Sequence, residues 1–117
     1  DADARVKLQD DATLELGLRS VAIGKMLYKG CETITPRRIR AFSFARSLQS
    51  RARKLGYSDA EIDAYLDSDV DKDRVKAKAR AYLKAKGTDF AKPATLCMVG
   101  AAEIKSGTAV GKLLRLH

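Results

Sequence analysis

The chain has 117 residues, which is enough for one domain with a single hydrophobic core and too few for two. Hydrophobic residues make up 45% of it and charged residues 32%, a balance that excludes both a disordered polyelectrolyte and an integral membrane protein. Lysine and arginine outnumber aspartate and glutamate by 23 to 15, so the formal net charge is +8 and a basic surface is expected.

The chain begins with Asp1-Ala2-Asp3-Ala4 rather than with methionine. This is typical of the end that signal peptidase leaves, so we expect an exported, periplasmic protein whose signal peptide has been removed. We expect residues 1–10 to form a flexible N-terminal segment.

The apolar pattern predicts a first helix over Asp11–Lys29, capped by Asp10 or Asp11. Its apolar residues occupy most of the circumference, which indicates packing on more than one side. Gly17 and Gly24 share one face seven residues apart, which suggests that another helix approaches closely there; tolerated weak spots are the alternative.

A second helix is predicted to open at Thr35-Pro36, with threonine as the cap and proline in the first turn, and to end at Gly56. An apolar stripe at helical spacing marks its inner face. The stripe consists of Ala41, Phe44, Ala45, Leu48, Ala52 and Leu55. Ile39 and Phe42 fall outside this stripe.

The remaining helices are predicted from their caps. The capping box Ser58–Glu61 starts a short third helix, and a fourth runs from Ser68 or Asp69 to Lys86. A last helical region is expected over Ala94–Arg115, broken near Ser106-Gly107, with Thr108 able to cap a final short helix. We therefore predict an all-α single domain over residues 1–117, with four to six helices in an orthogonal or bundle-like arrangement.

Cys31 and Cys97 are the only cysteines. They fit one disulfide in an exported protein, and Cys97 shares an inward face with Ala101 and Ile104. Two buried free thiols, which need no export, are the alternative.

A basic block without acids lies between Thr33 and Ser58. Its seven bases are Arg37, Arg38, Arg40, Arg46, Arg51, Arg53 and Lys54. Such a block favours an acidic protein, anionic lipid head groups or nucleic acid as the partner, and a solvated helix face is the alternative. Export and the lack of an aromatic stacking strip argue against nucleic acid.

An aromatic ring among arginines is typical of a docking anchor. We therefore predict a contact surface for a protein partner on the second helix, made of Ile39, Phe42, Arg46 and Arg53, with Arg38 and Arg40 at its edge. The alternative is that another part of the same chain covers Ile39 and Phe42.

No residue pattern points to catalysis or to a bound cofactor. The only histidine is the terminal His117, and no glycine-rich phosphate loop occurs. The alternating acids of Asp67–Asp73 are similar to an EF-hand loop, but Lys72 and Lys78 stand where that loop needs glycine and glutamate. We therefore predict helix-capping acids at this position, no metal or cofactor site, and a protein that is not an enzyme.

Several segments resemble a small family of uncharacterised alphaproteobacterial proteins. The resemblance extends from about Leu14 to Arg115. It rests on Ile39–Leu48, Arg51–Ile62, Ala81–Leu83, Leu96–Cys97, Glu103–Ile104 and Gly111–Arg115. It implies a short secreted chain with a cleaved signal peptide and two cysteines, which match Cys31 and Cys97.

Members of this family are similar to proteins encoded among the subunits of the proton-pumping NADH:quinone oxidoreductase. The resemblance therefore implies an accessory subunit or assembly factor on the periplasmic side of this respiratory membrane complex, and not a redox partner. It transfers no site residues. The expected function is a non-catalytic exported interaction protein; the alternatives are a peripheral module that binds anionic lipid head groups and a cytosolic nucleic-acid-binding protein.

Overall fold

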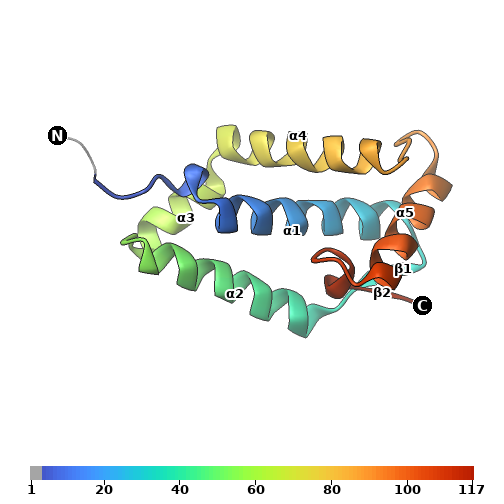
Figure 1. Ribbon diagram of the computed structural model, residues 1–117, viewed down its shortest axis with the longest axis horizontal. Coiled ribbons are helices and arrows are strands. Elements are labelled where there is room, and N and C mark those ends of the chain that lie inside the picture. Colours follow the sequence, from blue (N-terminus) through green and yellow to red (C-terminus); the bar gives the residue numbers. More distant parts are fainter. Residues whose placement is uncertain (1–3) are drawn as a thin grey trace.

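The long helix α1, Ala12–Gly30, lies in the middle of the structure, between α2 and α4 (Figure 1). The computed structural model describes residues 4–117. The other elements in chain order are η1 Leu8–Asp10, β1 Ile34–Pro36, α2 Arg38–Lys54, α3 Asp59–Asp67, α4 Asp69–Ala85, α5 Pro93–Ser106, η2 Gly111–Leu113 and β2 Leu114–Leu116. The predicted helical domain is confirmed, with five α-helices among the described residues and a small two-stranded sheet in addition.

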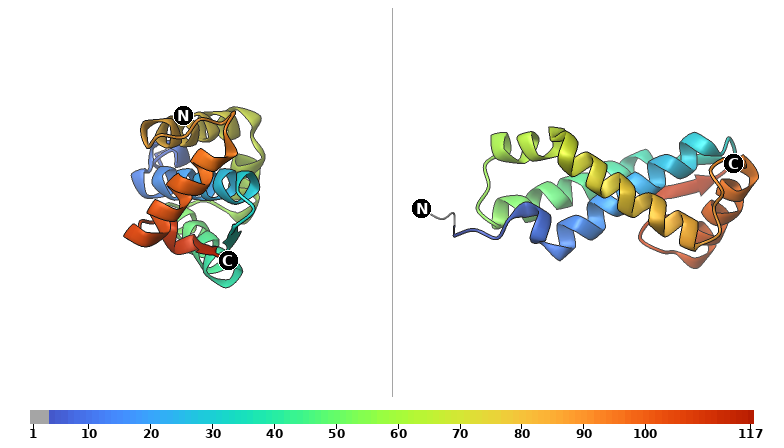
Figure 2. Two further views of the ribbon diagram at one scale, coloured as in Figure 1. Left: turned by 90° about the vertical axis from the view of Figure 1, so that its right-hand side faces the viewer. Right: turned by 90° about the horizontal axis from the view of Figure 1, so that it is seen from above.

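The helices are arranged around α1 as their common neighbour. The helices α1 and α4 run in the same direction and cross, as the view from above shows (Figure 2). Helix α2 returns in the opposite direction on the other side of α1, and α5 lies across the end of the bundle (Figure 1). This arrangement buries α1 on several sides, as its apolar circumference predicts.

Two hydrophobic cores lie along α1, one at each half, although the chain length predicts a single core; both are possible in one domain because they share α1. The core at its C-terminal half consists of Ile23, Leu27, Cys31, Ile34, Ala79, Leu83, Leu96, Val99, Val110 and Leu114. The core at its N-terminal half consists of Leu8, Leu14, Leu48, Ala52 and Ile62. The first core joins α1 to α4, α5 and the sheet, and the second joins it to η1, α2 and α3.

Two carboxylates at the start of α1, the N-cap Asp11 and Glu15 in the first turn, tie the helix to its neighbours. Asp11 caps the helix and pairs with Arg51 of α2 at 2.7 Å, and hydrogen bonds from Arg51 hold the pKa of Asp11 below its usual range. Glu15 pairs with Arg74 of α4 at 2.6 Å and with Lys78 at 2.7 Å. Burial alone would raise the pKa of Glu15, but these bonds more than offset it and place the pKa below its usual range.

Helices α3 and α4 begin where their caps predict. The Ser58–Glu61 capping box is present, with both of its hydrogen bonds, and Ser68 caps α4 by accepting from the backbone of Asp71. The chain leaves α4 through Gly87, which has a φ of 105° that favours glycine.

Residues 5–10, which belong to the segment 1–10 that we expect to be flexible, contact the rest of the domain. Leu8 is buried, and the Tyr57 hydroxyl donates to the carbonyl of Val6 at 2.7 Å. The Arg5 guanidinium donates to both oxygens of Glu61, at 3.0 and 2.9 Å, and these bonds help to lower the pKa of Glu61 to about 2. Residues 1–3 lie outside the described residues.

The start of the predicted second helix is wrong. Ile34–Pro36 is extended and forms β1, and α2 begins at Arg38. Arg37 is the N-cap residue of α2, and its side chain forms no capping hydrogen bond. The backbone N–H of Arg37 donates to the carbonyl of Leu113 at 2.7 Å, which requires an extended chain at this point. The Thr35-Pro36 pair therefore precedes a helix without starting it.

The end of the predicted last helix is also wrong. Helix α5 ends at Gly107, in the left-handed region at a φ of 64°, as the predicted break requires. The Thr108 hydroxyl then accepts from the backbone of Gly111, in the turn that leads into η2. Beyond η2, Leu114–Leu116 pairs antiparallel with Ile34–Pro36 as β2.

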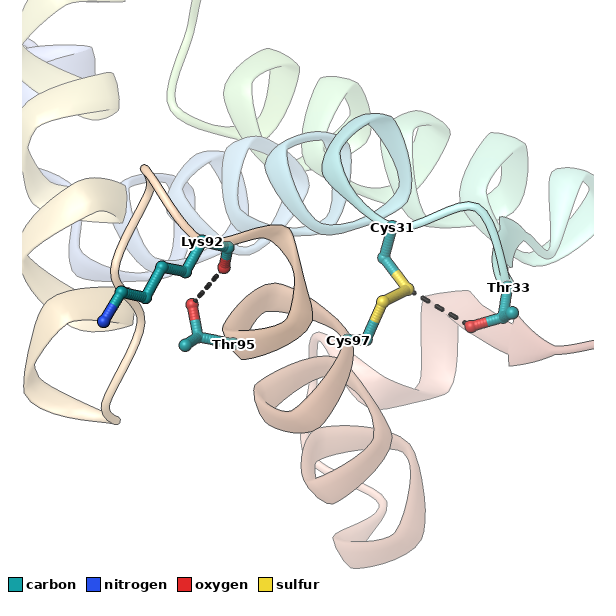
Figure 3. Close-up of a disulfide and its surroundings, with 5 residues drawn as sticks. All are labelled: Cys31, Thr33, Lys92, Thr95 and Cys97. Atoms are coloured by element: carbon teal, nitrogen blue, oxygen red, sulfur yellow. Dashed lines mark hydrogen bonds between the residues drawn. A yellow bond between two sulfur atoms is a disulfide. The ribbon is translucent and has the colours of Figure 1, made fainter.

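The Cys31–Cys97 disulfide is present and joins the end of α1 to α5 (Figure 3). The S–S distance is 2.06 Å and the Cα atoms are 5.2 Å apart. Both cysteines of the chain are in this bond, so the prediction is confirmed and the alternative of two free thiols is wrong. The disulfide is consistent with an oxidising, extracytoplasmic compartment.

We expect the disulfide to supply a large part of the stability. It joins residues 66 positions apart, and closing a loop of this length removes about 4 kcal/mol of chain entropy from the unfolded state. The double variant Cys31→Ala/Cys97→Ala should therefore lose about that free energy of unfolding in a urea titration. Reductant should destabilise the native protein and leave the double variant unchanged. A decrease in the free energy of unfolding below about 1 kcal/mol would contradict stabilisation by the disulfide through chain entropy.

A comparison of Gly17 with Gly24 tests whether close packing against α1 requires glycine. A Cβ at position 17 would lie 2.4 Å from Leu48 Cδ2, whereas a Cβ at position 24 would lie at an ordinary 3.9 Å from Leu114. We expect Gly17→Ala to cost about 1–3 kcal/mol through overpacking, and Gly24→Ala to gain up to about 1 kcal/mol of helix propensity. Urea titrations of the two variants measure both effects. In a Leu48→Ala background the cost of Gly17→Ala should disappear; if it persists, the contact is not its cause.

Candidate interaction surface on α2

The first half of α2 is held by the C-terminal segment more than by apolar packing. The backbone N–H and the Nε of Arg37 donate to the carbonyls of Leu113 and Leu114, at 2.7 and 3.1 Å. Arg40 donates to the carbonyl of Lys112 at 3.3 Å. Buried side chains on α2 occur only in its second half, at Leu48 and Ala52.

Ile39 and Phe42 are exposed on this first half of α2. Their side chains are among the most exposed large apolar ones of the described residues, at 85% for Ile39 and 64% for Phe42. The predicted alternative, that another part of the chain covers them, does not hold for the described residues. The guanidinium of Arg46 lies 5.6 Å from the centre of the Phe42 ring, within the range of a cation–π contact.

Phe42 lies at the edge of an apolar cleft between α1 and α2. The cleft has a volume of about 300 Å³. It is lined by Val21, Gly24, Lys25, Tyr28, Pro36, Arg38, Ala41, Phe42, Leu113 and Leu114. An aromatic ring that is already exposed at the edge of an apolar cleft can be covered together with that cleft by one partner.

A basic hollow at the start of α2 is lined in part by Ile39. Its volume is about 610 Å³, and four arginines line it: Arg37, Arg38, Arg40 and Arg115. Arg115 comes from β2, where it stands opposite Thr35 in the sheet register. The sequence contains no local signal for this placement, because it depends on strand pairing between residues about 80 positions apart along the chain.

The charges on α2 divide into two groups. Among the ion pairs of the described residues, those on α2 involve Arg51, with Asp11, and Arg53, with Asp59 at 2.7 Å. The arginines around Ile39 and Phe42 form no ion pair within residues 4–117. Guanidinium groups bind carboxylates in a bidentate geometry, so this half of α2 presents uncompensated charge suited to an acidic partner.

The structure brings together most of the predicted site residues. Ile39, Phe42 and Arg46 lie within two turns of α2, with Arg38 and Arg40 beside them. Arg53 shares their helix face, but it lies about 16 Å from Phe42 along the axis and its charge is paired with Asp59. We therefore define the anchor surface as Ile39, Phe42, Arg38, Arg46 and Arg115.

A buried polar cluster lies away from this surface. The carboxylate of Glu103 accepts from the hydroxyls of Tyr82 and Thr108, each at 2.8 Å. Burial and the bond to Glu103 raise the pKa of Tyr82. Glu103 is only 4% exposed, and its bonds link α4, α5 and the turn that precedes η2.

Within residues 4–117, no cluster of three or more histidine, cysteine, aspartate or glutamate side chains is placed to hold a metal ion. The helices in that part of the chain are also too short or too polar to span a membrane.

Comparison with known proteins places the chain in a family. Searches of curated proteins and of solved structures found no match. A family model covers residues 6–115, which include all five α-helices of the described residues, β1, β2 except its last residue Leu116, and the anchor surface. The chain therefore belongs to DUF5333, a family of unknown function.

Proposed function

We propose that the protein is a non-catalytic interaction domain that binds a partner protein through the anchor surface in the periplasm. The observation that carries the proposal is the exposure of Ile39 and Phe42 among arginines that have no ion pair within the described residues. Interfaces take most of their binding energy from a few residues of this kind, with aromatic side chains and arginine enriched among them.

The chemistry of the surface defines the partner. Full burial of a side chain such as Phe42 is worth about 1.5–3 kcal/mol, and the adjoining apolar cleft can add to it. The guanidinium groups of Arg38, Arg46 and Arg115 surround the ring and would bind carboxylates. The pocket of the partner that receives Phe42 is therefore expected to be surrounded by carboxylates. The partner is therefore a protein with an apolar pocket and an acidic rim.

The compartment and the sequence resemblance narrow the choice of partner. The disulfide supports an oxidising compartment, and the periplasm is the one that the resemblance implies. The same resemblance leads us to propose the periplasmic side of the NADH:quinone oxidoreductase as the binding site, with the protein as an accessory subunit or assembly factor.

Anionic lipid head groups are the second candidate, because four arginines line the basic hollow at the start of α2. Binding through charge alone weakens steeply as salt screens it, whereas an apolar anchor depends on salt much less. The salt dependence of binding therefore separates a protein partner from a lipid surface.

The double variant Phe42→Ala/Arg46→Glu tests the proposal. It removes the exposed ring and reverses the charge beside it, so we expect the affinity for the partner to fall about tenfold or more. The measurement is capture of NADH:quinone oxidoreductase subunits from detergent-solubilised membranes of the native source, followed by a titration with the purified complex. Thermal stability should stay within about 2 °C of the native protein, because surface substitutions usually change stability little.

A matched control is Met98→Ala/Lys105→Glu, which removes one exposed apolar side chain and reverses one charge on α5. This control should bind like the native protein. A fall in melting temperature of many degrees for the α2 variant would show that Phe42 is a core residue. Capture of a different protein that is lost only in the α2 variant would support the anchor surface and overturn the choice of complex.

A further inference from the structure

A second groove is lined mainly by residues of α1 and α4. Figure 2 shows how these two helices cross. The groove is formed by the second half of α1 and the first half of α4, with Tyr65 and Leu66 of α3 beside the start of α4. Its volume is about 550 Å³, within the range of about 300–1,000 Å³ that is typical of small-molecule sites. The function proposed above does not use this groove.

The floor of the groove is apolar. It is formed mainly by Leu18, Val21, Ala22 and Met26 of α1 and by Val75 of α4. From Leu18 to Lys29, α1 extends for about 16 Å at 1.5 Å per residue. This length provides an apolar track on which most of an extended acyl chain can lie.

The charged residues of the groove are almost all lysines. Lys25, Lys29, Lys72 and Lys76 line it, two from each helix. Within residues 4–117 none of these four ammonium groups forms an ion pair, as the pairs found there involve other cations. The one carboxylate in the lining, that of Asp71, is already paired with Arg74.

We propose that this groove binds a single-chain anionic amphiphile of the fatty-acid class. The acyl chain would lie on the apolar floor and the carboxylate would meet the lysines. Lysine suits this arrangement, because its methylene stem packs along hydrocarbon while its ammonium group stays at the surface. The charge complementarity excludes a cationic ligand and makes an uncharged alcohol of the same length a poor one.

The test uses the whole protein with its disulfide intact and decanoate as the probe. We expect decanoate to shift backbone amide resonances of the second half of α1 and the first half of α4 in ¹⁵N NMR titrations. Each added methylene from octanoate to dodecanoate should tighten binding about threefold to fourfold. Decanol should bind at least about tenfold more weakly than decanoate, because it forms no charge-assisted bond.

Two variants separate this site from the anchor surface. Lys29→Glu/Lys76→Glu reverses one charge on each helix and should weaken decanoate binding about tenfold or more, while decanol binding stays unchanged. Lys84→Glu/Lys105→Glu reverses two charges outside the groove and should bind decanoate like the native protein. Phe42→Ala/Arg46→Glu should also bind decanoate like the native protein. Decanoate binding therefore tests the groove even if the function proposed for the anchor surface is wrong.

Three results would overturn the proposal. The first is the absence of binding at millimolar decanoate, and the second is equal weakening by both lysine variants. The third is capture of a protein partner that is lost in Lys29→Glu/Lys76→Glu while decanoate does not bind, which would assign the groove to protein docking.

Discussion

The fold depends on one constraint: a single helix, α1, must complete two hydrophobic cores. Leu14 belongs to the core with α2 and α3, whereas Ile23 and Leu27 belong to the core with α4, α5 and the sheet. Each end of α1 is then fixed by a specific bond. Asp11 caps the start and pairs with Arg51 of α2, and the disulfide at Cys31 ties the end to α5. Because α1 contributes side chains to both cores, we expect a substitution that displaces either end of α1 to affect the packing of both cores.

The exposure of the anchor surface follows from this arrangement. The second half of α2 packs on α1 in the close contact that Gly17 permits, but the C-terminal segment occupies the place beside its first half. That segment is itself tightly placed, since a Cβ at Gly111 would lie 1.9 Å from the carbonyl oxygen of Glu103. The first half of α2 is therefore fixed by hydrogen bonds from the backbone N–H and the Nε of Arg37 to the C-terminal segment, and Phe42 stays exposed.

Local signals in the sequence predict the features that depend on local interactions. The Ser58–Glu61 capping box, the extent of α1 and the break at Gly107 are all visible in the residue types, because each depends on neighbours within one turn. The residue pattern does not predict the sheet, because its strands have three residues each and pair across most of the chain. The same pairing places Arg115 on the anchor surface and makes Pro36 part of a strand. Because the residue pattern does not predict the strands, it also does not predict Arg115 as a site residue. Ile39 and Phe42 were recognisable because they depart from the apolar stripe of their own helix.

The two proposed surfaces differ in the kind of base that they use. The acid-free block around α2 contains six arginines and one lysine, whereas the groove between α1 and α4 is lined by four lysines and no arginine among the described residues. Arginine presents a rigid fork that stacks on rings and binds carboxylates in two bonds, which favours a fixed protein interface around Phe42. Lysine is a point charge on a flexible apolar stem, which tolerates a ligand whose carboxylate can take several positions along a groove. If net charge alone governed binding, arginine-to-lysine substitutions at Arg38 and Arg46 would be neutral. The anchor surface requires that they weaken binding, because lysine keeps the charge and loses the geometry.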